Sequence, residues 1–148
     1  MLYQNERKTF LIEEVTLSEQ STDNQDLKIQ KALKLYLVGR LTVEEHREGF
    51  ETYFDMFRDG NYTHAIFDYL KLEYDPPQSR AWFVTNYVPR YGRELKHREC
   101  YLALIESSNL FQKMTTSLIA SSVKKIYNNL HISFFEDIEK AQSWLLKQ

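Results

Sequence analysis

The feature that most constrains this chain is a change in the spacing of its hydrophobic residues near residue 42. Over residues 27–41 most apolar side chains occupy every second position, which predicts strands with one polar face and antiparallel pairing. Beyond residue 42 the apolar side chains Phe50, Phe54 and Phe57 recur at helical spacing. A period that switches from 2.0 to 3.6 within one chain predicts a fold that contains both strands and helices.

The spacing of hydrophobic residues also predicts the elements in the rest of the chain. It predicts strands at residues 8–17, 27–41, 63–70, 99–105 and 131–135, and helices that begin near residues 42, 75, 109 and 137. Strands that alternate with helices call for right-handed crossovers and a parallel sheet. We therefore expect a single α/β domain over residues 1–148, with a mixed, mostly parallel sheet of about five strands, four helices and an opening antiparallel hairpin.

Local signals predict where these helices begin and end. Thr42 and Glu45 have the spacing of a capping box, and Gly60 predicts a left-handed C-terminal stop. Asp75 can cap the second helix, and Pro89 predicts its end. The spacing in the last helix predicts that Trp144 packs on the sheet. Lys31 and Gly39 interrupt the alternation of the second strand, which predicts a break or bulge.

The element order and several segments resemble the STAS-like family, the anti-anti-sigma-factor-like domains of bacteria. The resemblance covers about residues 27–147. It rests on the opening strands, the helix after Gly39-Arg40-Leu41-Thr42, the strand His64-Ala65-Ile66-Phe67-Asp68 and the closing segment Phe135-Glu136-Asp137-Ile138-Glu139-Lys140-Ala141-Gln142-Ser143-Trp144-Leu145. It implies a STAS-like α/β fold that serves as a docking module for a regulatory protein partner in bacterial signalling.

Many members of this family are switched by phosphorylation of a Ser or Thr at the start of the helix after the Asp-bearing strand. The corresponding residues here are Asp75-Pro76-Pro77-Gln78-Ser79, so prolines replace the Asp-Ser-Ser-Gly pattern of the switching members. Ser79 is the nearest hydroxyl, and we expect that it is not a regulatory phosphorylation site.

The composition of the chain indicates its cellular location. The net charge of −2 gives no general attraction to nucleic acid or to an anionic membrane. The single cysteine, Cys100, forms no internal disulfide, and we expect it to be a buried structural thiol. No apolar signal core and no run of membrane-spanning length is found. These observations predict a cytoplasmic protein.

A search for catalytic motifs argues against an enzyme. The sequence has no Cys-x-x-Cys, His-Glu-x-x-His, Gly-x-Ser-x-Gly, Walker or dinucleotide-binding pattern. The four histidines, His46, His64, His97 and His131, lie far apart in the sequence. We therefore expect no metal, no cofactor and no catalytic residues.

Candidate partner-binding residues lie around the C-terminal end of the predicted strand 63–70. Ligands of open α/β sheets bind at the carboxyl ends of parallel strands, and the residues there are Asp68, Tyr69, Tyr74, Asp75 and Ser79. Carboxylates at this position could hold a metal or act as acid and base, and the tyrosines can add rigid contact area to a partner surface. The alternative is that Asp75 is only a helix cap.

A second group of candidates is basic. Arg90, Arg93, Lys96 and Arg98 form the main basic concentration, and Asn109 begins the next predicted helix. Such a group can bind an anion. The alternative is a solvated connection between a helix and a strand.

Two functions from different classes are compatible with these patterns. The first is a non-catalytic regulatory protein-interaction module, which could also form a homodimer. The alternative is a binding protein for a small apolar or anionic ligand, with a pocket between the helices and the sheet. In that case the aromatic residues of the helices that contain Phe54 and Trp82 would line the pocket.

Overall fold

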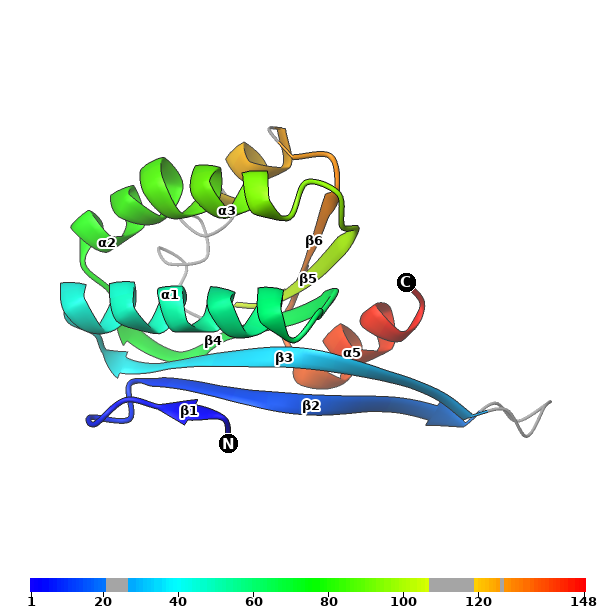
Figure 1. Cartoon of the computed structure of the whole chain (residues 1–148). Helices are drawn as coiled ribbons and strands as arrows, with labels where there is room; N and C mark the ends of the chain where they lie inside the picture. The colour runs from blue at the N-terminus through cyan, green and yellow to red at the C-terminus, as the bar shows by residue number, and fades with distance from the viewer. Residues whose placement is uncertain (21–26, 107–118, 126) are drawn as a thin grey trace.

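The structure is a computed structural model, and it describes residues 1–20, 27–106, 119–125 and 127–148. In these residues a six-stranded sheet, in the order β1-β2-β3-β4-β5-β6, has helices on both faces (Figure 1). The strands are β1 (Tyr3–Gln4), β2 (Phe10–Gln20), β3 (Leu27–Arg40), β4 (His64–Tyr74), β5 (Cys100–Ile105) and β6 (Leu130–Phe135). The helices are α1 (Val43–Asp59), α2 (Pro77–Trp82), the π-helix η1 (Phe83–Tyr87), α3 (Val88–Glu94), α5 (Ile138–Leu146) and the helical residues 119–125.

The strand pairing confirms the predicted fold class. Strands β1, β2 and β3 pair antiparallel, and β3, β4, β5 and β6 pair parallel. The sheet is therefore mixed and opens with the predicted hairpin of β2 and β3. The two-residue strand β1 was not predicted, because two residues are too short to show a hydrophobic period.

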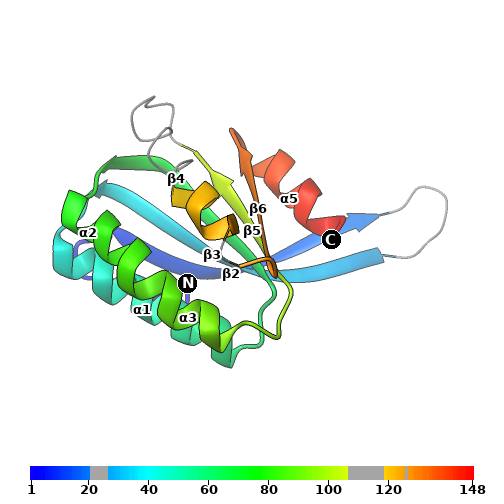
Figure 2. The same cartoon turned by 90° about the horizontal axis from the view of Figure 1, so that it is seen from above.

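The second strand is long, and part of it leaves the sheet. β3 pairs with β4 only from Leu33 onward, whereas its pairing with β2 continues back to Leu27. The two strands therefore extend beyond the rest of the sheet as a two-stranded ribbon (Figure 2). The bulge predicted at Gly39 is confirmed, because the register shifts there and Gly39 has a φ of 70°. The interruption predicted at Lys31 is wrong, because β3 pairs with β2 in unbroken register through Lys31.

The start of α1 confirms the predicted capping box. The Thr42 hydroxyl accepts a hydrogen bond from the Glu45 amide at 3.2 Å, and the Glu45 carboxylate accepts one from the Thr42 amide at 3.0 Å. The predicted left-handed stop at Gly60 is wrong. Gly60 has a φ of −80°, and the left-handed residue is Asn61, with a φ of 56°.

A distant side chain helps to end α1. The Arg98 guanidinium donates to the carbonyls of Phe57, Arg58 and Tyr62 at 3.4, 3.4 and 3.0 Å. The Phe57 and Arg58 carbonyls also accept from the amides of Tyr62 and Asn61, so Arg98 adds a long-range contact to the last turn of α1. The prediction from the sequence considered only neighbouring residues and therefore assigned the end of α1 to Gly60.

The second helix differs from its prediction at both ends. Asp75 is not its cap, because the N-cap is Pro76 and makes no side-chain capping bond. Pro89 does not end the helix, because α2, η1 and α3 follow one another without a break. At the junction the Val88 amide bonds to the Phe83 carbonyl, five residues back. Pro89 lies just after this π-helix, at the second residue of α3.

The two faces of the sheet carry separate cores. On one face, α1, the α2–η1–α3 helices and residues 119–125 cover a large aromatic cluster that includes Phe50, Phe54 and Phe67. On the other face α5 packs through Ala141 and Leu145, which are fully buried. Trp144 packs on that cluster but is only half-buried, so Leu145 is the main contact of this helix. The start predicted for the preceding helix at Asn109 lies outside the described residues.

Candidate ligand-binding cavity

A cavity of about 180 Å³ lies between the larger helix layer and the sheet. Its walls come from α1, from the α2–η1–α3 helices, from β4 and β5 and from residues 119–125. The lining is mostly apolar and aromatic. It includes Phe54, Phe57, Phe67, Leu102, Leu104 and Val123.

The sequence periods explain why these side chains converge. Alternate residues of a strand share a face, so Phe67 and Tyr69 of β4 point toward the helices together. Phe50 of α1 is only 1% exposed, and its ring makes edge-to-face contacts with Phe67, Phe83 and Tyr87 at centroid distances of 4.9–5.7 Å. The π-helix brings Phe83 and Tyr87 into a stack at 4.8 Å above Phe50. Such π segments occur frequently at functional sites.

One end of the cavity is polar. It contains His46 from the first turn of α1, Asp75 after β4 and Arg80 on α2. The Arg80 Nε donates to an Asp75 carboxylate oxygen at 3.2 Å, and Nη2 donates to the Asp75 carbonyl at 3.1 Å. Burial raises the pKa of Asp75, although Arg80 opposes the shift. This buried pair contributes no net charge when both groups are ionised.

His46 is buried in this end, with 4% of its surface exposed. Its ring packs on Phe50 at 4.6 Å and edge-on to Trp82 at 6.3 Å. Burial, together with the nearby Arg80 charge, lowers the pKa of His46 to about 4, so its imidazole is neutral at pH 7. Its Nδ1 atom has no hydrogen-bond partner among the residues that the structure describes.

The predicted partner-binding residues are divided between the two faces of the sheet. Asp68 lies on the α5 face, where its carboxylate pairs with Lys34 at 3.2 Å. Tyr69 and Asp75 line the cavity on the opposite face. Tyr74 is 37% exposed, with the Arg40 guanidinium 4.5 Å above its ring.

The last residue of that group, Ser79, is 2% exposed, and its hydroxyl has no described partner. A phosphate on Ser79 would require the start of α2 to open. This burial supports the expectation that Ser79 is not a regulatory phosphorylation site.

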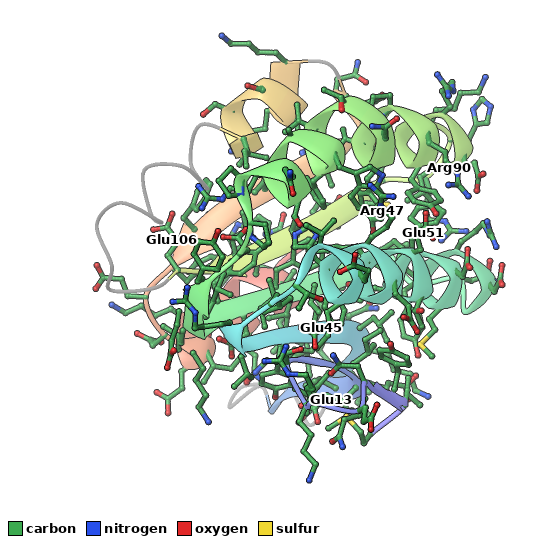
Figure 3. All side chains as sticks on the ribbon, turned by 90° about the vertical axis from the view of Figure 1, so that its left-hand side faces the viewer. Glu13, Glu45, Arg47, Glu51, Arg90 and Glu106 are labelled. Atoms are coloured by element: carbon green, nitrogen blue, oxygen red, sulfur yellow. The ribbon has the colours of Figure 1, made fainter. Side chains whose placement is uncertain are left out.

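The basic residues also have different surroundings. Arg98 binds the carbonyls at the end of α1, so its guanidinium is already occupied. Arg90 is exposed, and its guanidinium lies over the Tyr91 ring. It pairs with Glu51 at 3.5 Å, and Figure 3 shows these two side chains beside each other, Arg90 on α3 and Glu51 on α1. Arg93 and Lys96 are exposed. Asn109 lies outside the described residues.

The structure identifies site residues that the sequence analysis missed. His46 and Arg80 were not candidates, because neither belongs to a recognisable motif. One available signal was that His46 precedes Phe50 by one helical turn and therefore shares its buried face. Cys100 is buried as predicted, and burial raises its pKa to about 11. Within the described residues no group of three or more His, Cys, Asp or Glu side chains could hold a metal ion.

A comparison with solved structures supports the fold. The chain is similar to the crystal structure of an uncharacterized DUF3478-family protein from Shewanella loihica PV-4, which has a SpoIIAA-like fold. The two are 23% identical, with a TM-score of 0.51, over 91% of this chain and 95% of that one. No protein-family model and no curated protein matches this chain. The chain therefore has a SpoIIAA-like, STAS-like α/β fold, and none of its described helices is long and apolar enough to cross a membrane.

Proposed function

We propose that this protein binds a small, largely apolar molecule in the cavity between its helices and its sheet. The observation that carries the proposal is an aromatic cavity of about 180 Å³ with a few polar groups at one end. Ligand sites commonly combine an apolar lining with a few convergent polar groups. An engineered apolar cavity of about 150 Å³ in another protein binds benzene, so the volume fits a molecule of one or two rings.

A cavity-filling variant tests this proposal. Ala65 on β4 lines the cavity and is 7% exposed, so Ala65→Met adds volume inside it. We expect the parent protein to bind naphthalene in a fluorescence titration, and Ala65→Met to bind it at least tenfold more weakly. Ala81→Met adds the same side chain at an exposed position of α2 and should bind like the parent.

Circular dichroism and a melting curve verify that both variants are folded. If Ala65→Met is not folded, Ala120→Val fills the cavity from residues 119–125 instead. No binding by the parent, or equal binding by a folded filled variant, contradicts the proposal.

A regulatory interaction with a protein partner is the second candidate function. The observation that favours it is the exposed ring of Tyr74 at the end of β4, held under Arg40. We propose that the function is binding without catalysis, in one cytoplasmic domain over residues 1–148. Formation of a homodimer stays a prediction.

Tyr74→Ala tests the partner surface. Because the side chain is exposed, we expect the melting temperature to change by about a degree or two at most. Capture of a specific protein partner in pull-downs should fall at least tenfold. Unchanged capture places the partner surface elsewhere, and Arg90→Ala then tests the exposed basic residues.

A further inference from the structure

We infer that the cavity selects an uncharged ring compound that bears a carbonyl group, and that the hydroxyl of Tyr69 donates a hydrogen bond to the carbonyl oxygen. The inference rests on the proposed function and specifies the chemical class of the ligand. It follows from the position of Tyr69 on β4, from the hydrogen bonds of the polar groups around it and from their summed charge.

The first step places the Tyr69 side chain in the cavity wall. Tyr69 lies two residues after Phe67 on β4, so both side chains are on the sheet face that the helices cover. Both residues line the cavity, and their rings meet edge-to-face at a centroid distance of 6.4 Å.

The second step concerns the surface that Tyr69 keeps accessible. Protein surrounds its hydroxyl, and this burial, together with the Asp75 charge, raises the pKa of Tyr69 far above its ordinary value. Even so, the residue is only partly buried. Because Tyr69 lines the cavity and is otherwise surrounded by protein, its remaining accessible surface faces the cavity, where a ligand can reach it.

The third step concerns the hydrogen bonds of the polar groups in the lining. The Tyr69 hydroxyl forms no hydrogen bond with any residue that the structure describes. By contrast, the Tyr53 hydroxyl already donates to the Leu33 carbonyl at 2.8 Å. The Arg80 guanidinium likewise already donates to Asp75. A ligand that accepts from Tyr69 therefore supplies a bond that the described part of the fold does not.

Three other buried polar atoms lack partners among the described residues, but protein encloses each of them. They are His46 Nδ1, His64 Nε2 and Ser79 Oγ. A ligand reaches none of these atoms unless the fold rearranges. The Tyr69 hydroxyl needs no such rearrangement, because Tyr69 keeps accessible surface in the cavity.

The fourth step concerns the hydrogen-bonding character of a phenolic hydroxyl, which can both donate and accept. Its lone pairs are partly delocalised into the ring, so it donates strongly and accepts weakly. A carbonyl oxygen accepts this proton and brings no donor of its own. An alcohol would bring a second donor, and the mostly apolar lining would leave that donor unpaired at a cost in affinity.

The last step concerns charge. The Asp75–Arg80 pair sums to zero, and the imidazole of His46 is neutral at pH 7. A carboxylate ligand would bring an unbalanced negative charge into an apolar cavity beside Asp75. Burial of an unpaired charge costs far more than burial of a neutral carbonyl. The site therefore favours an uncharged ligand.

A matched pair of ligands tests the inference. Acetophenone and α-methylstyrene have nearly the same shape, and the carbonyl oxygen of the first is a methylene group in the second. Each competes with naphthalene in the fluorescence titration at pH 7, with the parent and with Tyr69→Phe, which removes only the hydroxyl. The preference for acetophenone over α-methylstyrene should be at least fivefold larger in the parent, because the variant leaves the buried carbonyl without its donor.

Two control measurements limit the comparison to the Tyr69 hydroxyl. Tyr69→Phe should bind naphthalene as the parent does, because naphthalene accepts no hydrogen bond from a hydroxyl in this way. Tyr36→Phe removes a hydroxyl that bonds to Glu13 and does not line the cavity, so its preference should equal that of the parent. The cost of removing each ligand from water is the same for every variant and cancels.

An independent measurement needs no variant. The infrared carbonyl stretch of acetophenone bound to the parent should lie at a lower frequency than in hexane, because a hydrogen bond weakens the C=O bond. A frequency equal to that in hexane overturns the inference.

The remaining outcomes separate this inference from the proposed function. An equal preference in the parent and in Tyr69→Phe, or failure of acetophenone to displace naphthalene, overturns this inference alone. Equal preference is also the result expected if a bound water occupies the Tyr69 hydroxyl. Failure of the parent to bind naphthalene overturns the proposed function as well. Benzoate, an anion of similar size, should displace naphthalene more weakly than acetophenone, and tighter binding would overturn the charge argument.

Discussion

Replacing Asp68 with leucine is expected to lower the free energy of unfolding by about 3–5 kcal/mol. The side chains of Lys34 and Asp68 are only 8% and 11% exposed, and their charged atoms lie 3.2 Å apart. Removal of the carboxylate leaves the Lys34 ammonium buried without its counter-ion. The Leu70 amide, which donates to Asp68 at 3.1 Å, also loses its acceptor. Urea unfolding of parent and variant, with unchanged m-values, measures the difference.

Two controls separate burial from charge. The double variant Lys34→Met with Asp68→Leu should recover most of the loss, because replacing both partners of a buried pair with apolar residues is often neutral. Lys31 on the same strand pairs with Glu14 at 3.0 Å but is 63% exposed, so Lys31→Ala should change stability by less than about 1 kcal/mol. A loss below about 1 kcal/mol in Asp68→Leu would mean that solvent reaches Asp68, which would make it available to a partner.

Regular patterns made most of the fold predictable. Alternation over residues 27–41 identified β3 and its pairing with β2, and the Thr42–Glu45 spacing identified the start of α1. These features depend on neighbours in the sequence. The end of α1 depends instead on Arg98, about 40 residues away, and no local pattern predicts such a contact.

The site was harder to predict for a related reason. Asp68 and Tyr69 lie in β4 and Asp75 directly follows it, and all three were assigned to one surface because they are close in sequence. The two-residue period of a strand sends Asp68 to the α5 face and Tyr69 to the helix face. Chain order alone ended the strand at residue 70, before its observed end at Tyr74. It also could not assign the faces, because both faces of the first half of this strand are covered and neither shows a polar pattern.

The helix end predicted at Pro89 is wrong, and the difference affects the candidate site. Pro89 predicts a helix end, but the π-helix before it shifts the hydrogen bonding by one residue and allows the helical segment to continue. The continued helix places Tyr87 and Tyr91 against Phe54 and so completes one wall of the cavity. The feature that local propensity missed is therefore part of the candidate site.

Acidification is expected to destabilise the protein through His46. In the unfolded chain this histidine binds a proton near its ordinary pKa of 6.5, whereas in the folded protein its pKa is lowered to about 4. Between these values the unfolded state binds more protons, so stability rises with pH. The contribution is complete above about pH 6.5 and is lost as the pH falls to about 4. At about 1.4 kcal/mol per pKa unit the loss is roughly 3 kcal/mol.

Urea unfolding at pH 7 and pH 4 measures this loss, and variants assign it to His46. His46→Leu should lose about 3 kcal/mol less than the parent over this interval. Burial also lowers the pKa of His64, so part of the acid sensitivity should persist in that variant. His97 is exposed, and His97→Asn is the matched control, which should follow the parent curve. Equal acid losses in the parent and in His46→Leu would show that water reaches this imidazole and that its burial does not lower its pKa.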